Sequence, residues 1–479
     1  MIFNSVSYLL FFPIVTILYF AFPKKLRNAW LLIASYFFYM NWNAAYGLLL
    51  FGSTMITYLC SLLVEWAKEK KQSVRLAKAA MAASFLLNLG LLFYFKYLNF
   101  AIVNLNRISS LFHGRQISAF DILLPVGISF YIFQALGYTM DVYRGKIKAC
   151  RNFFRYALFV SFFPQLVAGP IVRARDFIPQ IRRPLYVSSE MFGQGIFLIV
   201  SGLFKKAVIS DYISVNFVER IFDNPGLYSG VENLFGVYGY ALQIYCDFSG
   251  YSDMAIGIAL LLGFRFPINF NSPYKSDSVT DFWHRWHISL STWLRDYLYI
   301  SLGGNRKGKF RTYVNLILTM LLGGLWHGAS WNFIVWGGLH GVALAVHKFF
   351  RSLLKRPKTY RSTGIRRFFA VLITFHFVCF CWIFFRNTTF EASLTMIRQI
   401  GTAFHPEVFV QLVTGYWKVF ALMGVGYLLH WCPDRWQDAC GRLVVRTPLV
   451  GQALLLIALI WLVIQVKSSD IQPFIYFQF

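Results

Sequence analysis

A histidine stands at the centre of the stretch LTMLLGGLWHGASWNFIVWGGLHG, residues 318–341. Apolar runs at 312–326 and 330–347 flank its GGLWHGAS junction and predict a helical hairpin. The first run would climb only about 22 Å, less than the ~30 Å core of a bilayer, so His327 is expected inside a membrane or near its outer boundary. An ionisable imidazole at that depth is costly, which favours a functional group. The alternative is a core histidine bonded to a neighbouring carbonyl.

A second candidate lies in SVTDFWHRWHISLSTWLRDYLYISLGGNR, residues 278–306. Ser278 followed by Asp281 resembles a capping box that opens a helix. A continuous helix would have one polar face, formed by Asp281, His284, Arg285, Thr292, Arg295 and Asp296. His287 falls near the apolar edge of that helix and is expected to point into the protein. A metal triad of Asp281, His284 and His287 is conceivable, but this spacing alone indicates it weakly.

Two carboxylates lie in the otherwise apolar stretch YALQIYCDFSGYSDMAIGIALLLGF. Buried carboxylates need partners, so Asp247 and Asp253 could orient a histidine or line a polar channel. Ion pairing with an arginine of the polar-faced helix is an equally good interpretation. His340 and His347, which follow the hairpin apex, are interpreted as packing and interface residues.

The composition is that of a membrane protein. Of 479 residues, 57% are hydrophobic and 14% charged, against roughly 25% charged in soluble proteins, and the mean hydropathy is +0.53. The long apolar runs lack the short alternation of a β-barrel, so we expect an all-α polytopic membrane protein. Because the positive charges fall in short loops between spans, the net charge of +26 does not indicate nucleic-acid binding. The seven cysteines show no disulfide or metal-ligand spacing, and no metal is expected.

Basic loops predict the orientation of the chain. The Lys/Arg-rich loops 67–78, 305–311 and 348–367 are expected in the cytoplasm. Counting spans forward from the third loop places the C-terminal residues outside, and the basic residues after the first span place the N-terminus outside too. The first apolar run has no preceding positive charge and no small-residue cleavage site, which favours a retained span over a signal peptide.

We therefore expect one membrane domain, residues 1–466, with roughly ten to twelve spans of about 20 residues each. An extracytoplasmic tail, residues 467–479, would follow it. The less hydrophobic stretch Arg265–Lys309 would lie along the membrane or dip into it from the cytoplasm.

These segments resemble the membrane-bound O-acyltransferase (MBOAT) family, in particular its alginate O-acetylation branch of AlgI and PatA type. The resemblance rests on long motifs in the family's order, which are YCDFSGYSDMAIGIALLLGFRFPINFNSPY, DFWHRWHISLSTWLRDYLYISLGGNR, LLGGLWHGASWNFIVWGGLHG and FIYFQF. The upstream stretch LVAGPIVRARDFIPQI is similar as well, so the resemblance covers nearly the whole chain. It implies a ring of helices, with re-entrant or half helices, around a central tunnel.

The resemblance also implies the site and its substrates. His327 matches the family's almost universal histidine and His287 its upstream polar residue, and both would be catalytic within a core of residues 278–347. Residues expected to line or orient the tunnel are Asp247, Asp253, Trp326 and Asn332. His284 stands where similar proteins often carry arginine, which weakens the metal hypothesis further. The donor would be acetyl-CoA, with no bound cofactor, and an extracytoplasmic SGNH-type transferase would pass the acetyl group to a polysaccharide outside the bacterial cytoplasmic membrane.

The tail FIYFQF can then be interpreted as an acyl carrier. A tyrosine phenol has a pKa of about 10, close to the ~8.5 of a thiol, so Tyr476 could take an acetyl group from CoA and pass it to an alcohol. His327 would accept the phenolic proton. Phe474, Phe477 and Phe479 would anchor the tail, which at ~3.3 Å per residue is long enough to reach mid-membrane. The alternative is an aromatic cap on the last span, at the membrane interface.

The phosphates of CoA would need cations on the cytoplasmic side, and the candidates are Lys275, Arg285, Arg295 and Arg306. One rival function is the transfer of D-alanyl or a longer acyl group, which pocket size would decide. Another is a transporter or flippase, a class that tends to show two similar halves. No such internal symmetry is evident in this sequence.

Overall fold

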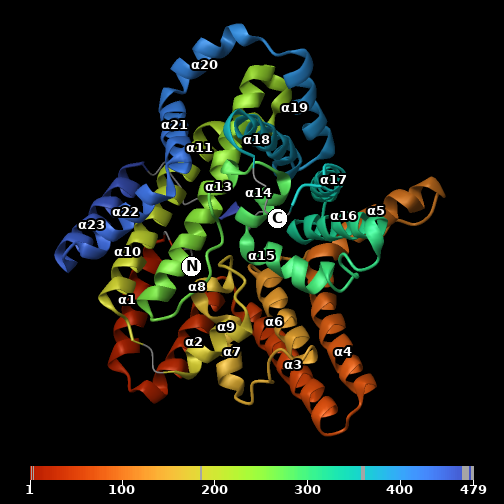
Figure 1. Cartoon of the computed structure of the whole chain (residues 1–479), viewed down its shortest axis with the longest axis vertical. Helices are drawn as coiled ribbons and strands as arrows, with labels where there is room; N and C mark the ends of the chain where they lie inside the picture. Colours follow the sequence, from red (N-terminus) through yellow and green to blue (C-terminus); the bar gives the residue numbers. More distant parts are fainter. Residues whose placement is uncertain (2, 4, 184–185, 358–361, 467–473, 476–479) are drawn as a thin grey trace. The chain divides into compact units, whose positions relative to one another are not determined.

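The computed structural model describes the whole chain except residues 2, 4, 184–185, 358–361, 467–473 and 476–479. Every secondary-structure element in the described part is helical, which confirms the predicted all-helical fold class (Figure 1). The chain forms two compact units, one of Met1–Ser188 with Ile258–Pro267 and one of Ser189–Gly257 with Ile268–Phe479. The expected domain boundary at residue 466 adjoins residues outside the description and stays a prediction.

The first unit is a helical bundle. Its helices are α1 (Val6–Ala21), α2 (Lys24–Met40), α3 (Ala44–Glu69), α4 (Val74–Leu92), the π turn η1 (Phe93–Tyr97), α5 (Leu98–Leu111), α6 (Ile128–Tyr143), α7 (Phe153–Ser161), α8 (Phe163–Leu166) and α9 (Ala174–Arg182). Ser5, Asn43 and Ser73 cap α1, α3 and α4 by accepting bonds from first-turn amides.

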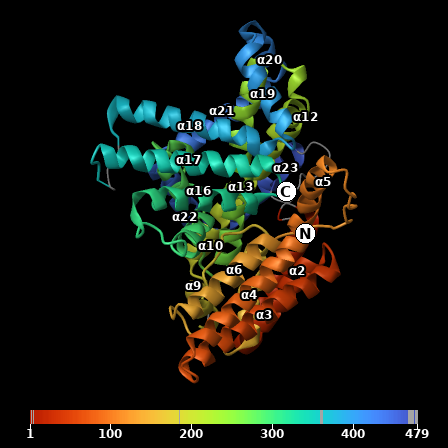
Figure 2. The same ribbon diagram turned by 90° about the vertical axis from the view of Figure 1, so that its right-hand side faces the viewer.

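Small polar side chains hold α3, α4 and α6 together at the centre of this unit. Ser53 donates to Asn88 Oδ1 over 2.5 Å, and Ser61 and Ser84 both lie 3.3 Å from the Thr139 hydroxyl. Short side chains allow close approach of helices whose outer faces are apolar. The three helices accordingly lie side by side (Figure 2).

The second unit carries the candidate site. Its helices begin with α10 (Ser189–Leu203), the π turn η2 (Phe204–Ser210), α11 (Asp211–Ile213), the π turn η3 (Ser214–Val218), α12 (Glu219–Asp223), η4 (Pro225–Leu227) and most of α13 (Gly230–Leu261). The central segment holds η5 (Pro273–Lys275), α14 (Val279–Arg285), α15 (Ile288–Trp293), the π turn η6 (Leu294–Tyr299), α16 (Gly308–His327) and α17 (Trp331–Leu353). The last helices are α18 (Gly364–Arg386), α19 (Phe390–Thr402), η7 (Pro406–Val408), α20 (Phe409–Gly415), α21 (Trp417–Trp431), α22 (Asp434–Arg446) and α23 (Leu449–Val466).

Four described helices are long and apolar enough to cross a membrane, namely α3, the continuous Val74–Leu111 helix, α17 and α18. A fifth is possible if Pro406–Gly415 and Trp417–Trp431, bent by 92°, count as one broken span. Two shorter apolar helices also lie in the described part, Ser7–Ala21 of α1 and Leu449–Gln465 of α23. The membrane class is thus supported, and the expected ten to twelve spans stay a prediction.

Candidate active site

The helices α16 and α17 form the predicted hairpin, with His327 as the last residue of α16. Two glycines let the helix backbones touch. A methyl group on Gly324 would lie 2.1 Å from the Phe333 carbonyl oxygen, and one on Gly337 would lie 2.3 Å from that of Met320. The hairpin is therefore confirmed, and it depends on glycine at its contact.

The length of α16 differs from the expectation. The helix begins at Gly308 and has 20 residues, because its basic first turn, which was counted as loop, is also helical. The described helices that are long and apolar enough to cross a membrane do not include α16, so the inference that the first apolar run is too short to cross is not contradicted. The depth of His327 stays a prediction.

Aromatic rings surround the His327 imidazole. The ring centroids of Trp326, Trp336 and Phe385 lie 5.0, 5.0 and 5.2 Å away, and the side chain is 3% exposed. The carbonyl end of a helix favours a positive charge within its last turn. His327 therefore lies in a water-poor aromatic box at the carbonyl end of α16.

The polar-faced helix is broken at His287. Ser278 caps α14 by accepting a bond from the Asp281 amide, as the capping box predicts, but α14 ends at Arg285. His287 has φ +42° and ψ 55° and is the N-cap of α15. The expected continuous helix is wrong, because a residue in the left-handed region cannot continue a right-handed helix.

A polar network fixes the tautomer of His287. Its Nδ1 lies 3.2 Å from Asn269 Oδ1, and the same oxygen accepts the Ser289 backbone amide at 3.1 Å and the Ser289 hydroxyl at 2.9 Å. A backbone amide can only donate, so the shared atom is an acceptor and His287 Nδ1 is the protonated nitrogen. Asn269 Nδ2 in turn donates to Ser252 Oγ at 3.2 Å. The lone pair of His287 is therefore on Nε2.

Burial keeps His287 neutral. Its side chain is fully buried, as expected from the sequence, and it lies between α14 and α15, outside the candidate spans. Desolvation lowers the pKa of His287 from 6.5 to about 3. Asn269, which orients it, was missed from the sequence, since it shows no charge, spacing or periodic signal of its own.

Trp326 connects the two histidines. Its ring centroid lies 5.0 Å from that of His327 and 6.1 Å from that of His287. Phe248 of α13 packs on His287, and the centroids of the two rings lie 4.6 Å apart. The structure therefore brings both predicted catalytic histidines and the predicted tunnel residue Trp326 into one aromatic cluster.

The two carboxylates of α13 pair with lysines. Lys206 Nζ lies 2.5 Å from Asp247 Oδ1, and Lys205 Nζ lies 2.6 Å from Asp253 Oδ2. Both lysines belong to the π turn η2, whose wider backbone aims two successive side chains at α13. The interpretation that these carboxylates pair with an arginine was therefore wrong. Nothing in the sequence indicated that Lys205 and Lys206 would be their partners.

Part of the tail is buried against α13. Phe474 is fully buried, with its ring 5.4 Å from Phe248 and 4.9 Å from Tyr251. The Ile475 backbone amide donates to Asp247 Oδ2 at 2.9 Å. Phe248 thus contacts the tail on one side and His287 on the other. Phe474 is thus buried within the second unit, and its role as an anchor of the tail stays a prediction.

Three other predicted tail residues, Tyr476, Phe477 and Phe479, lie outside the described residues. Their roles stay predictions. Asn332 is buried, and its side-chain amide donates to the Asn387 carbonyl at 2.7 Å, so it joins α17 to the start of the α18–α19 link.

The remaining histidines have neighbours of their own. His340 accepts a bond from Trp283 Nε1 at 3.2 Å and packs on Trp336, in keeping with a packing role. His347 lies 2.7 Å from the Thr280 hydroxyl, and His284 is exposed. Within the described residues, no three His, Cys, Asp or Glu side chains gather as a metal ion would require.

Most of the cations expected at CoA are already paired. Lys275 lies 3.0 Å from Asp434 and donates to the Cys432 carbonyl at 2.8 Å. Arg285 pairs with Asp281 and Arg295 with Asp296, each at 2.8 Å. Arg306 is exposed.

Comparison with known proteins identifies the family. Residues 150–394 match the model of the MBOAT, membrane-bound O-acyltransferase family. The probable alginate O-acetylase AlgI of Azotobacter vinelandii is 44% identical, over 83% of this chain and 77% of that protein. The peptidoglycan O-acetyltransferase of Helicobacter pylori is 37% identical, over 83% and 79%, and the teichoic acid D-alanyltransferase of Bacillus subtilis is 32% identical, over 56% and 69%. The chain therefore belongs to the membrane-bound O-acyltransferase family, and it is an O-acyltransferase.

Proposed function

We propose that this enzyme moves acetyl groups from cytoplasmic acetyl-CoA across a bacterial cytoplasmic membrane, through an ester on Tyr476, to an extracytoplasmic SGNH-type transferase that O-acetylates a polysaccharide. The acetyl group is favoured by O-acetylase relatives at 42–44% identity. The observation that carries the proposal is the buried contact of Phe474 and Ile475 with α13. Phe248, which Phe474 contacts, also packs on His287, so this contact supports a role for the tail in the chemistry of that cluster.

The proposed relay has two balanced steps. In the first, the phenolic oxygen of Tyr476 attacks the thioester carbonyl, the C–O bond forms and the C–S bond breaks. The phenolic proton passes to the imidazole of His327 and from there to the departing CoA thiolate. In the second, an alcohol of the partner attacks the tyrosyl ester, and its proton passes to the leaving phenolate, which restores Tyr476.

The two histidines take different parts in this relay. His327, at the carbonyl end of α16, serves as the general base. His287 stays neutral and positions the thioester or shapes the tunnel beside it, held by Asn269. Asp247 holds the tail through the Ile475 amide, and Lys206 neutralises its charge.

The donor is proposed to enter from the cytoplasmic side, where the basic loops are expected. CoA phosphates would meet cations of the 275–306 region, among Lys275, Arg285, Arg295 and Arg306. Exposed Arg306 is the candidate best able to accept a new anion, because the other three already have carboxylate partners. By the same orientation, both termini lie outside the cytoplasm.

A D-alanyl cargo is the second candidate. It is favoured by the 32% identity to a teichoic acid D-alanyltransferase, but that match spans only 56% of the chain. Incubation with acetyl-CoA or with a D-alanyl thioester, followed by analysis of the labelled tail, separates the two.

The variant Tyr476→Phe tests the relay, because it keeps the aromatic side chain and removes the nucleophilic hydroxyl. We expect loss of polysaccharide O-acetylation in cells that produce the variant. Tyr186→Phe changes an exposed tyrosine of the first unit and serves as the matched control. Normal O-acetylation with Tyr476→Phe would contradict the proposal.

The variant Asp247→Asn tests whether Asp247 holds the tail. Because asparagine keeps a neutral acceptor, the hydrogen bond should weaken by about 1 kcal/mol, and we expect proteolytic cleavage after Lys467 to become about fivefold faster. Asp253→Asn is the control, since Asp253 pairs with Lys205 and accepts no bond from Ile475. Equal cleavage rates for the two variants would show that Asp247 does not hold the tail.

A further inference from the structure

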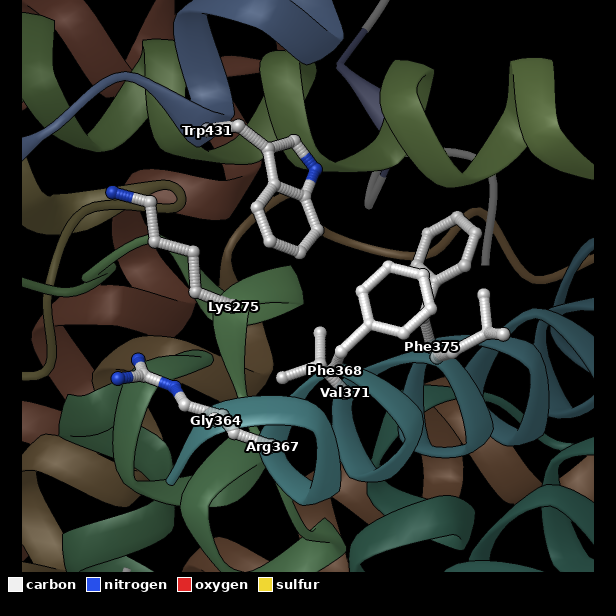
Figure 3. Close-up of a pocket in the computed structure, with 8 residues that line it drawn as sticks. Lys275, Gly364, Arg367, Phe368, Val371, Phe375 and Trp431 are labelled. Atoms are coloured by element: carbon white, nitrogen blue, oxygen red, sulfur yellow. The ribbon is translucent and has the colours of Figure 1, made fainter. Parts of the chain in front are cut away.

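A groove beside α18 includes Lys275, one of the four candidate cations for CoA, but none of the residues proposed for the acyl relay. Its volume is about 640 Å³, within the range of about 300–1,000 Å³ typical of ligand sites. It is lined by α18, by η5 and by Trp431 at the end of α21 (Figure 3). All of these elements belong to the second unit.

One wall of the groove is an apolar face of α18. Phe368, Val371, Leu372 and Phe375 line it at spacings of three, four and seven residues, which place them on one side of the helix. They extend over about 10 Å along the helix axis. Because α18 is a candidate span, this wall runs in the direction that a lipid acyl chain takes in a bilayer.

The end of the groove opposite the rings of Phe368 and Phe375 is cationic. Figure 3 shows the charged ends of Lys275 and Arg367 on one side and the rings of Phe368 and Phe375 on the other. Asp434 pairs with Lys275, so Arg367 supplies the net positive charge. Gly364, the first residue of α18, also lines the groove, and within the described chain the Thr363 side chain does not cap that helix. The first backbone amides of α18 therefore add to the attraction of the groove for an anion.

A layer of buried aromatic rings separates the groove from His287. Phe375 packs on Tyr274 at 5.4 Å, and Tyr274 packs on Trp286 at 6.4 Å. The Tyr274 hydroxyl donates to the Ala241 carbonyl at 2.5 Å, which holds this layer in place. The rings of Tyr274 and Trp286 therefore lie between the wall of the groove and the segment that carries His287.

We propose that this groove binds a phospholipid with an anionic headgroup. The headgroup phosphate would lie at Arg367 and Lys275, and one acyl chain would lie along the apolar face of α18. Trp431, at the same groove, suits the boundary between headgroup and hydrocarbon. The basic loop before α18 is expected in the cytoplasm, where the leaflet carries negative charge. The cationic end of the groove and the direction of its apolar wall thus match a single ligand that has an anionic headgroup and an acyl chain.

The test is native mass spectrometry of the full-length protein in detergent. The protein is titrated with dioleoylphosphatidylglycerol and, as a neutral lipid with the same chains, dioleoylphosphatidylcholine. We expect the anionic lipid to bind more tightly, and Arg367→Gln to weaken it about tenfold, as the loss of a charged hydrogen bond predicts. Arg366→Gln is the matched control, because Arg366 is the exposed neighbour that does not line the groove. Leu372→Trp, which narrows the groove from its exposed side, should weaken both lipids.

Three results would overturn the proposal. Equal binding of the two lipids would show that the charge is not recognised. Equal weakening by Arg367→Gln and Arg366→Gln would show that the cation acts from outside the groove. Displacement of the bound lipid by acetyl-CoA, one for one, would assign the groove to the acyl donor instead. None of these results depends on Tyr476 or His327, so they leave the proposed relay untouched.

Discussion

His327 and His287 are both buried in one aromatic cluster, yet their surroundings differ in nearly every respect. His327 ends a helix of 20 residues and is enclosed by aromatic rings. His287 begins a short helix in the left-handed region, and Asn269 fixes its tautomer. His327 lies at the carbonyl end of a helix, where the helix dipole favours a positive charge, and His287 lies at the amino end of one, where it does not.

The difference teaches how two identical side chains can take different roles. A proton acceptor gains from the carbonyl end of a helix, where the imidazolium is stabilised as it forms. A positioning group gains from a fixed tautomer and from burial that keeps it neutral. The following predictions test this contrast, from the largest expected effect to the smallest.

Removal of the base should have the largest effect. We expect His327→Ala to lower the rate of acetyl transfer by about 10³, the contribution typical of a positioned general base. The measurement is the single-turnover rate in detergent. His347→Gln is the control, because His347 lies on α17 of the same hairpin, contacts Thr280 of α14 and is not part of the relay. If the rate fell by less than tenfold in His327→Ala, a group other than His327 would accept the phenolic proton.

Disruption of the hairpin contact should come next. Gly324→Ala places a methyl group 2.1 Å from the Phe333 carbonyl oxygen. The resulting shift of the helices should lower the free energy of unfolding by about 3 kcal/mol. Gly338→Ala meets only Leu321, at an ordinary 3.4 Å, and should fold normally. Thermal unfolding in detergent compares the two. Equal melting temperatures would mean that α16 and α17 do not need their close contact.

Loss of the group that orients His287 should have a smaller effect. Asn269→Leu removes the acceptor of the Nδ1 proton at similar volume, and we expect the rate to fall about tenfold, as for other orienting partners. Asn269→Asp keeps the acceptor and should restore most of the rate. Asn271→Leu, at an exposed site two residues on, is the control. Identical rates for the Leu and Asp variants at 269 would make Asn269 a purely structural residue.

The pH profile should not report on His287 at all. Because burial lowers its pKa from 6.5 to about 3, His287 stays neutral as the pH falls from 8 to 5 and gains a proton only near pH 3. We therefore expect the acid limb of the pH–rate profile to keep its midpoint in His287→Asn, although the rate falls. A shifted midpoint would show that His287 titrates during catalysis.

Features that are local in the sequence were predicted well. The His327 hairpin follows from two apolar runs around a glycine-rich junction, and the capping box at Ser278 follows from neighbouring residues. Each of these depends on interactions within a few residues.

Features that depend on distant contacts were not predicted. The left-handed conformation of His287 is held by Asn269, 18 residues away in the chain. The partners of Asp247 and Asp253 come from a π turn about 45 residues upstream, whose geometry no helical wheel describes. A helical wheel assumes an unbroken helix, so it fails where tertiary contacts break one.

The most direct test of the acyl relay is the peptide mass of the purified protein after exposure to acetyl-CoA. Wild type, His327→Ala and Tyr476→Phe are compared, with digestion that releases the tail. The account predicts the mass of one acetyl group on the tail peptide of the wild type and on neither variant. An unmodified wild-type tail, in protein that still consumes acetyl-CoA, would contradict the tyrosyl ester and mean that the acetyl group passes directly to the partner.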